Sequence, residues 1–252
     1  MFVKREIHII CLLLFHLCVY AGDKVVKIAC VGNSITYGAR LKNPSKDSYP
    51  GVLEQMLGKG YDVRNFGVSA RTMLNKGDHP YMKEKKYKDA LDFNPDIVII
   101  KLGTNDSKPI NWVYKSDFMN DTELLINSFK SLSSKPRIIL CLPVPSIPNG
   151  KNINNEVICN EIIPLLKKAA KKLDVEIFDF YNAMSPYYPE LFPDDVHPNA
   201  RGAEIMAGLI YNKITGRKLL IKNLTECFLE RNQSGKGSTG LILLVLEDKL
   251  LW

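Results

Sequence analysis

The stretch Val25-Val-Lys-Ile-Ala-Cys-Val-Gly-Asn-Ser-Ile-Thr-Tyr-Gly38 carries the pattern that decides the fold. Its first part, residues 25–31, is short and mostly apolar, which predicts a β-strand, and turn and helix signals come after it. In open α/β sheets, ligands bind beyond the carboxyl ends of the strands. Because Ser34 comes just after this strand, we expect its hydroxyl at the ligand-binding edge. Taken alone, the Gly-Asn-Ser run also fits an ordinary turn.

The rest of the chain repeats this alternation of strand and helix. Short apolar segments predict four more strands at residues 62–66, 96–102, 137–142 and 175–178. Helical patterns lie between and after them, at residues 48–57, 117–132, 155–173 and 199–214. Such alternation predicts an α/β protein with a parallel five-stranded sheet covered by helices on both faces. Pro164 should either kink the third helix or begin a second segment.

The two ends of the chain differ from this pattern. Residues 1–22 predict a signal peptide, with two basic residues, then an apolar stretch, then small residues. The alternative is a membrane anchor, but the stretch is short and contains two histidines. We therefore expect an exported domain over residues 23–216, without stable membrane insertion. The extension at residues 217–252 contains a polar linker and a short apolar end, and the sequence assigns it no role.

Charge and cysteine content exclude several classes of protein. The formal net charge is +7, and the excess lies in runs such as residues 83–88 and 167–172. These runs lack interleaved aromatic side chains, so they favour solvated helix faces over nucleic-acid binding. The segment after residue 22 has four cysteines and no Cys-x-x-Cys pair. We expect neither a structural zinc site nor a disulfide framework.

A second segment supplies the base that a serine nucleophile requires. His197 comes after the last predicted strand and precedes the last helix, at the same edge as Ser34. Asp194 lies three residues earlier, a spacing at which a tight loop can turn its carboxylate onto the imidazole. Asp195 competes for this role, and both aspartates also fit simple turn chemistry. His79, in a polar turn-rich stretch, is predicted to be a surface residue.

Two further loops at this edge offer donors for an oxyanion. Gly67 comes after the second strand and would let the backbone approach a ligand closely. Asn105 comes after the third strand and can present its side-chain amide. Acyl transfer needs such donors, each worth roughly 3–4 kcal/mol where one has been removed. Each loop alone fits a turn, but together with the serine and the histidine they indicate acyl-transfer chemistry.

These motifs resemble the four blocks of the SGNH (GDSL-type) hydrolase family, in the same chain order, over about residues 25–216. The matching residues are Ser34, Gly67, Asn105, and Asp194 with His197. The resemblance implies a flavodoxin-like three-layer α/β/α sandwich and an esterase without metal or organic cofactor. It implies that Ser34, Asp194 and His197 are catalytic and that Ser34, Gly67 and Asn105 form the oxyanion hole. Asn33 departs from the aspartate of many relatives, at a position outside the triad.

The expected substrate is a small acyl ester, above all acetyl on a carbohydrate such as sialic acid or a plant or host glycan. The spelling Gly-Asn-Ser-Ile-Thr resembles exported carbohydrate and sialate O-acetylesterase-like members, and no long apolar loop suggests a fatty-acyl tunnel. Tyr37 and Trp112 are candidates to line the substrate, although both also fit hydrophobic cover over the core. A lysophospholipase or thioesterase, a non-catalytic carbohydrate-binding relative and a flavodoxin-like cofactor binder are the alternatives.

Overall fold

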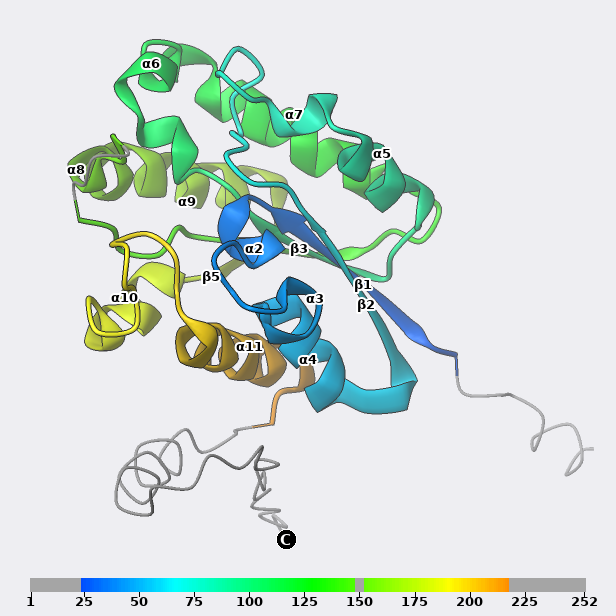
Figure 1. Ribbon diagram of the computed structural model, residues 1–252. Coiled ribbons are helices and arrows are strands. Elements are labelled where there is room, and N and C mark those ends of the chain that lie inside the picture. Colours follow the sequence, from blue (N-terminus) through cyan, green and yellow to red (C-terminus); the bar gives the residue numbers. More distant parts are fainter. Residues whose placement is uncertain (1–23, 148–151, 218–252) are drawn as a thin grey trace, which may run out of the picture.

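The computed structural model describes residues 24–147 and 152–217 (Figure 1). The predicted signal peptide at residues 1–22 lies outside the described residues. So does the predicted extension at residues 217–252, apart from its first residue. The described residues therefore belong almost entirely to the predicted hydrolase domain.

A parallel five-stranded sheet forms the centre of the molecule, as predicted. The strands lie in the order β2-β1-β3-β4-β5, and all four neighbouring pairs are parallel. This is the strand order of flavodoxin-like folds. The bounds are β1 (Val26–Gly32), β2 (Tyr61–Gly67), β3 (Ile97–Lys101), β4 (Arg137–Cys141) and β5 (Glu176–Phe178).

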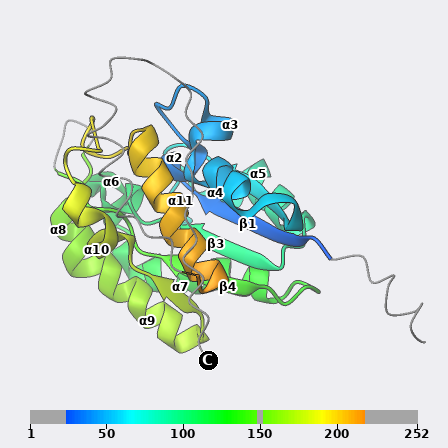
Figure 2. The same cartoon turned by 90° about the horizontal axis from the view of Figure 1, so that it is seen from below.

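Helices cover both faces of the sheet, which confirms the three-layer α/β/α architecture (Figures 1 and 2). One face carries α5 (Lys85–Asp92), α7 (Phe118–Lys130) and α9 (Ile163–Leu173), whose apolar residues share a buried cluster with Val31 and Val98. The other carries α4 (Tyr49–Leu57), α10 (Phe180–Met184) and α11 (Ala200–Thr215), which bury Cys30 and Ile99. Successive strand residues point to opposite faces, so the middle residues of β1, β3 and β4 are apolar on both sides.

The sequence signals for helix starts act as expected, and one predicted helix is divided. Asn199 caps α11 by accepting a hydrogen bond from the Gly202 N–H at 2.9 Å. The predicted helix at residues 155–173 consists of α8 (Asn155–Val157), a π-helical turn (Ile158–Ile162) and α9. Pro164 is the second residue of α9 and comes directly after the π-helical turn, so the second predicted segment begins beside it. The backbone stays right-handed helical across this junction, at both Ile162 and Ile163.

Short helices that the hydrophobic pattern did not reveal occupy the carboxyl edge of the sheet. They are α2 (Ser34–Tyr37), α3 (Pro44–Asp47) and α6 (Pro109–Trp112). Each has four residues, too few for a 3.6-residue hydrophobic period to register. In residues 24–147 and 152–217, no helix is both long and apolar enough to cross a membrane.

Candidate active site

Ser34 is the first residue of α2, directly beyond the carboxyl end of β1. The Asn33 side chain caps this helix by accepting a hydrogen bond from the Ile35 N–H at 3.1 Å. Gly38 ends the helix in the left-handed conformation, and its N–H donates to the Ser34 carbonyl. The Ser34 residue is only 8% exposed. A capped helical turn therefore holds the serine at the rim of the sheet with little access to bulk water.

His197 contacts both the serine and an aspartate. Its Nε2 lies 2.8 Å from the Ser34 Oγ, and its Nδ1 lies 2.8 Å from the Asp194 Oδ2. The other carboxylate oxygen, Oδ1, accepts the backbone N–H of His197 at 2.7 Å and that of Val196 at 3.2 Å. When Nδ1–H donates to the carboxylate, Nε2 is left as an acceptor for the serine proton. The structure thus joins the three predicted residues in one hydrogen-bonded chain.

The competing sequence interpretations do not reach this chain. Asp195 adopts a positive φ of 63°, and its backbone carbonyl accepts a hydrogen bond from the Tyr188 hydroxyl at 3.2 Å. His79 is exposed, as predicted for a surface residue. Asp194 is therefore the carboxylate of this site.

Arg40 is a neighbour that the sequence did not reveal. Its Nε lies 2.5 Å from the Asp194 Oδ2, the same oxygen that His197 contacts, while its side chain is 63% exposed. Nothing in the local sequence distinguishes it from other surface cations, since the contact depends on two loops more than 150 residues apart. Arg40 places a positive charge beside the carboxylate that contacts the imidazole.

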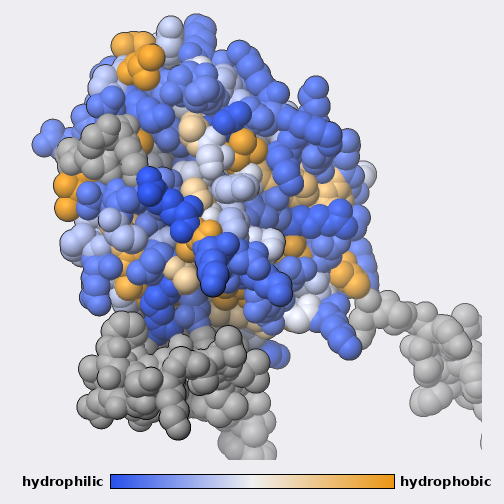
Figure 3. Space-filling view, in the orientation of Figure 1, coloured by the Kyte–Doolittle hydropathy of each residue, from blue (hydrophilic) through white to orange (hydrophobic). Residues whose placement is uncertain are grey.

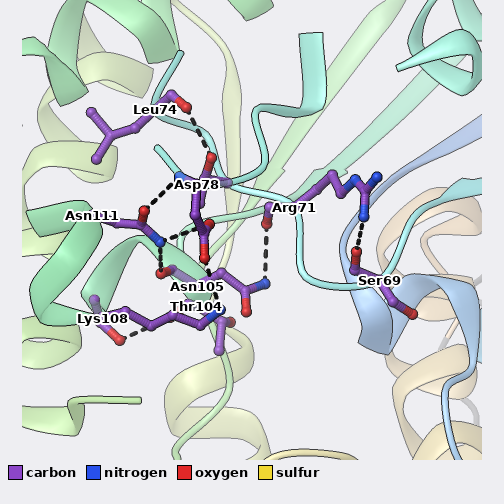
Figure 4. Close-up of polar contacts among 10 residues, drawn as sticks. Ser69, Arg71, Leu74, Asp78, Thr104, Asn105, Lys108 and Asn111 are labelled. Carbon is purple, nitrogen blue, oxygen red and sulfur yellow. Dashed lines mark hydrogen bonds and ion pairs between the residues drawn. The ribbon is translucent and has the colours of Figure 1, made fainter. Parts of the chain in front are cut away.

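Asn105 lies in the 3₁₀ turn Asn105–Ser107 beyond β3, with its amide pointing at the Arg71 carbonyl (Figure 4). Its Nδ2 donates one hydrogen to that carbonyl at 3.0 Å. An amide nitrogen has two hydrogens, so a second one is left for a ligand. The Ser34 N–H has no hydrogen bond to any described residue. These two groups fit the predicted role of oxyanion donors.

Gly67 does not fit the predicted role of donor. Its N–H already donates to the Asn65 Oδ1 at 2.9 Å. A Cβ at position 67 would lie 2.3 Å from the Tyr37 backbone nitrogen, so glycine is required there by the packing of α2 against β2. Past this point, the N–H groups of residues 69–71 have no hydrogen bond to any described residue, and Ala70 has a φ of 68°. Free backbone donors at this loop are thus found two to four residues beyond the predicted glycine.

The two predicted substrate-lining residues have different environments. Trp112 is 8% exposed and packs edge-on against Phe118 at a centroid distance of 5.4 Å, so it covers the core rather than a substrate. Tyr37 is 47% exposed and lies in the same short helix as Ser34, so it can still contact a substrate. Ile110 of α6 and Val113, directly after this helix, are exposed instead, and Figure 3 shows apolar side chains on the surface over α6.

Two buried ionisable groups lie at the same edge. Lys101 ends β3 and is fully buried, and desolvation lowers the pKa of its amine to about 7. Asp106 is also fully buried, and desolvation raises the pKa of its carboxyl to about 6, opposed by hydrogen bonds from backbone N–H groups. Two of these bonds come from Met73 and Leu74, at 3.0 and 2.8 Å. Asp106 therefore fastens the loop after β2 to the loop after β3.

No group of three or more His, Cys, Asp or Glu side chains within the described part of the chain is arranged to hold a metal ion. Cys30 and Cys141 are buried free thiols in β1 and β4, and burial raises the pKa of both thiols. They therefore pack as small apolar groups.

Comparison with known proteins agrees with this geometry. The model of the GDSL-like lipase/acylhydrolase family matches residues 30–205, a span that begins in β1 and ends in α11. The chain belongs to this family. The resemblance to SGNH (GDSL-type) hydrolases, drawn from the four motifs, is thereby confirmed.

Relatives within and around the family carry esterase names. An acetylxylan esterase of Xylanibacter ruminicola is 44% identical over 205 residues, which cover 75% of this chain and 43% of that protein. The chain thus spans less than half the length of this curated relative. Among solved structures, Est24, a carbohydrate acetylesterase from Sinorhizobium meliloti, superposes with a TM-score of 0.62 at 21% identity, over 76% of this chain and 99% of that one. An aryl esterase from M. smegmatis gives a TM-score of 0.63 at 20% identity, over 76% and 99%. At such identities the two structures establish the shared fold.

Proposed function

We propose that this protein is a serine esterase that removes acetyl groups from a carbohydrate. The observation that carries the proposal is the chain of contacts from Ser34 through His197 to Asp194, with both connecting distances at 2.8 Å. Serine is a poor nucleophile unless a positioned base takes its proton, and this arrangement supplies the base. The 44% identity to a protein named acetylxylan esterase supports acetyl as the acyl group and a plant polysaccharide as its carrier.

The proposed reaction has two halves. His197 Nε2 takes the Ser34 proton while Oγ attacks the ester carbonyl, and the carbonyl electrons move onto the oxygen. The carbonyl then re-forms, the bond from the acyl carbon to the sugar oxygen breaks, and His197 gives its proton to that oxygen, so that an acetyl-serine and a free alcohol result. Water, deprotonated by the same imidazole, attacks the acetyl-serine and releases acetate, and the proton returns to Ser34. Asp194 holds the ring and stabilises its charged form throughout.

Three loops would hold the oxyanion in this reaction. The Ser34 N–H and the second hydrogen of the Asn105 amide have no acceptor among the described residues. We assign the third donor to the backbone N–H of Ala70, because the Gly67 N–H is already bound to Asn65. A positive φ turns the peptide at Ala70 relative to its neighbours, and the adjacent Arg71 carbonyl contacts the Asn105 amide at 3.0 Å. Fixed donors of this kind stabilise the transition state because they need not reorient when charge develops.

The experiment is a measurement of acetate release by wild type and Ser34→Ala protein. O-acetylated xylan, acetylated pectin fragments and O-acetylated sialic acid are the glycan substrates. Acetyl and octanoyl p-nitrophenyl esters test the acyl length. We expect acetate from xylan, a preference for the acetyl ester, and loss of both activities in Ser34→Ala. A preference for octanoyl esters would instead favour a lysophospholipase-type or thioesterase-type acylhydrolase, and wild-type protein that binds xylan without turnover would indicate a non-catalytic relative.

We also propose that the protein is exported, from the signal-like composition of residues 1–22. An exported enzyme would meet polysaccharides that do not enter a cell. Expression of the full chain in a bacterial host, with N-terminal sequencing of the periplasmic fraction, tests this. Protein that stays in the cytoplasm with Met1 retained would contradict it.

A further inference from the structure

Asn111 connects the loop after β2 to the loop after β3 through a fully buried side chain (Figure 4). Its Nδ2 donates to the Asn105 backbone carbonyl at 2.9 Å and to the Asp78 Oδ1 at 3.0 Å. Its Oδ1 accepts the Asp78 backbone N–H at 2.7 Å. The side chain therefore uses both hydrogens and its oxygen, and all three bonds go to these two loops.

The position of Asn105 depends on this connection. Its backbone carbonyl accepts hydrogen bonds from the Asn111 amide at 2.9 Å and, less closely, from the Lys108 N–H at 3.3 Å. Its side-chain amide donates to the Arg71 carbonyl at 3.0 Å. The shorter bond to the carbonyl comes from Asn111, so this side chain contributes to the direction of the free amide hydrogen. Asn111 lies in α6, which follows the Asn105 turn. The next residue of this helix, Trp112, is buried in the core and holds α6 in place.

Other contacts hold the loop after β2 in place but do not touch Asn105. Asp106 accepts N–H groups of Met73 and Leu74, and Asp121 of α7 accepts the Asn75 N–H at 2.7 Å and its side-chain amide at 2.9 Å. These bonds hold the loop after β2 as a whole. Asp121 is 5% exposed and holds the same loop from α7, so its loss imposes a comparable structural disturbance at a distance from the amide.

We propose that Asn111 is a positioning residue for the oxyanion-binding amide of Asn105. This inference rests on the proposed esterase function and adds a residue to it. Asn111 does not contact the substrate. It sets the angle at which the Asn105 amide meets the developing negative charge, and it does so by holding the carbonyl of the same residue.

Asn111→Ala should therefore lower kcat more than it changes KM. Removal of one oxyanion donor costs about 10²- to 10³-fold in kcat, and a misplaced donor retains part of that benefit. We expect kcat for p-nitrophenyl acetate to fall about 30-fold in Asn111→Ala, with KM changed less than about threefold, because the acyl ester makes most of its ground-state contacts elsewhere.

A double-mutant cycle with Asn105→Ala separates positioning from general destabilisation. Once the amide is absent, Asn111 has nothing left to position, so Asn111→Ala should cost less than about threefold in that background. Asp121→Ala is the matched control, and it should lower the melting temperature by a similar amount while leaving kcat within about twofold. An equal loss of kcat from Asn111→Ala in both backgrounds, or an equal loss from Asp121→Ala, would overturn the proposal.

Two additions keep the test informative. If Asn111→Ala does not fold, Asp78→Ala removes only the partner side chain at a partly exposed position, and the same cycle with Asn105→Ala applies. The rate at which diethyl p-nitrophenyl phosphate labels Ser34, monitored by mass spectrometry, should fall in the same order as kcat. Failure of the esterase proposal would appear differently, as wild-type protein that neither hydrolyses the acetyl ester nor is labelled.

Discussion

The two ends of the parallel sheet differ in how far their polar side chains are exposed to solvent. At the amino end, charged side chains pair at the surface: Glu176 at the start of β5 contacts Arg137 at the start of β4 at 2.5 Å and Lys213 of α11 at 2.6 Å. At the carboxyl end, polar side chains are buried, and Ser34 and Asn105 are 8% and 7% exposed. One end keeps its charges hydrated, and the other removes its polar groups from water.

This difference indicates which end of the sheet contributes to stability and which end carries a stability cost for the sake of the site. A surface ion pair contributes little to stability, but its desolvation cost is also small. A buried polar group must find partners or destabilise the fold, yet in a dry environment its dipole acts more strongly on a bound ester. We therefore expect substitutions of site residues at the carboxyl end to change activity more than stability, and substitutions at the amino end to do the reverse. A buried group at the carboxyl end that lies outside the site should affect stability instead.

The largest expected effect is the loss of activity in Asp194→Asn. An amide in place of the carboxylate would donate to the imidazole where the carboxylate accepts, which favours the tautomer with the proton on Nε2. That nitrogen could then no longer take the Ser34 proton. We expect kcat/KM for p-nitrophenyl acetate to fall about 10⁴-fold, with a melting temperature close to that of wild type. A loss below tenfold would contradict the role of Asp194.

Lys101→Met tests the cost of a buried amine at the same end. Burial lowers the pKa of Lys101 from 10.5 to about 7, so between these values the unfolded chain binds a proton that the folded chain does not. Wild-type stability should therefore rise as the pH increases from about 7 to 10.5. Methionine removes the cost, and we expect Lys101→Met to be more stable at pH 7 by about 4 kcal/mol. Urea unfolding at pH 7 and pH 10 measures both, and the gain should shrink at pH 10.

Glu176→Gln is the counterpart at the amino end. Arg137 and Lys213 lower the pKa of Glu176 from 4.5 to about 2, so its stabilising effect is present above pH 4.5 and is lost as the pH falls toward 2. Because the side chain is 37% exposed, solvent screening reduces the effect to about 1 kcal/mol at pH 7. We expect Glu176→Gln to lower stability at pH 7, to match wild type near pH 2, and to keep full esterase activity. A reduced kcat would contradict the expectation that substitutions at the amino end leave activity unchanged.

Arg40→Gln has the smallest expected effect and combines features of both ends. This exposed cation contacts the Asp194 carboxylate, so water and salt screen its influence. We expect kcat/KM to change less than about fivefold at low ionic strength. The difference from wild type should diminish at 1 M NaCl, and Arg64→Gln, which removes an exposed arginine paired with Asp62 in β2, is the control. A larger, salt-independent loss would place Arg40 among the residues essential for activity.

The sequence was sufficient to predict the parallel sheet and the residues that meet at its carboxyl edge. Apolar strands alternate with helices, and the carboxyl ends of parallel strands must share one edge, so Ser34 and His197 were predicted to be neighbours. Helices of four residues could not be predicted, because they make barely one turn and a hydrophobic period needs several turns to be recognised. The core position of Trp112 could not be predicted, because an aromatic residue beside a site loop fits both a core and a substrate surface until burial is known.

Local pattern alone determined the fold class and placed Ser34, His197 and a preceding aspartate at one edge, since this depends on which residue types come after which strands. Only the tertiary structure decided that Asp194 rather than Asp195 contacts the imidazole. It also decided which backbone N–H groups are free, that Gly67 serves packing, and that Asn111 and Arg40 contact the site. The reason is physical: hydrogen bonding is a competition among groups brought together from distant parts of the chain. Its outcome depends on angstrom-scale distances that the order of residues does not specify.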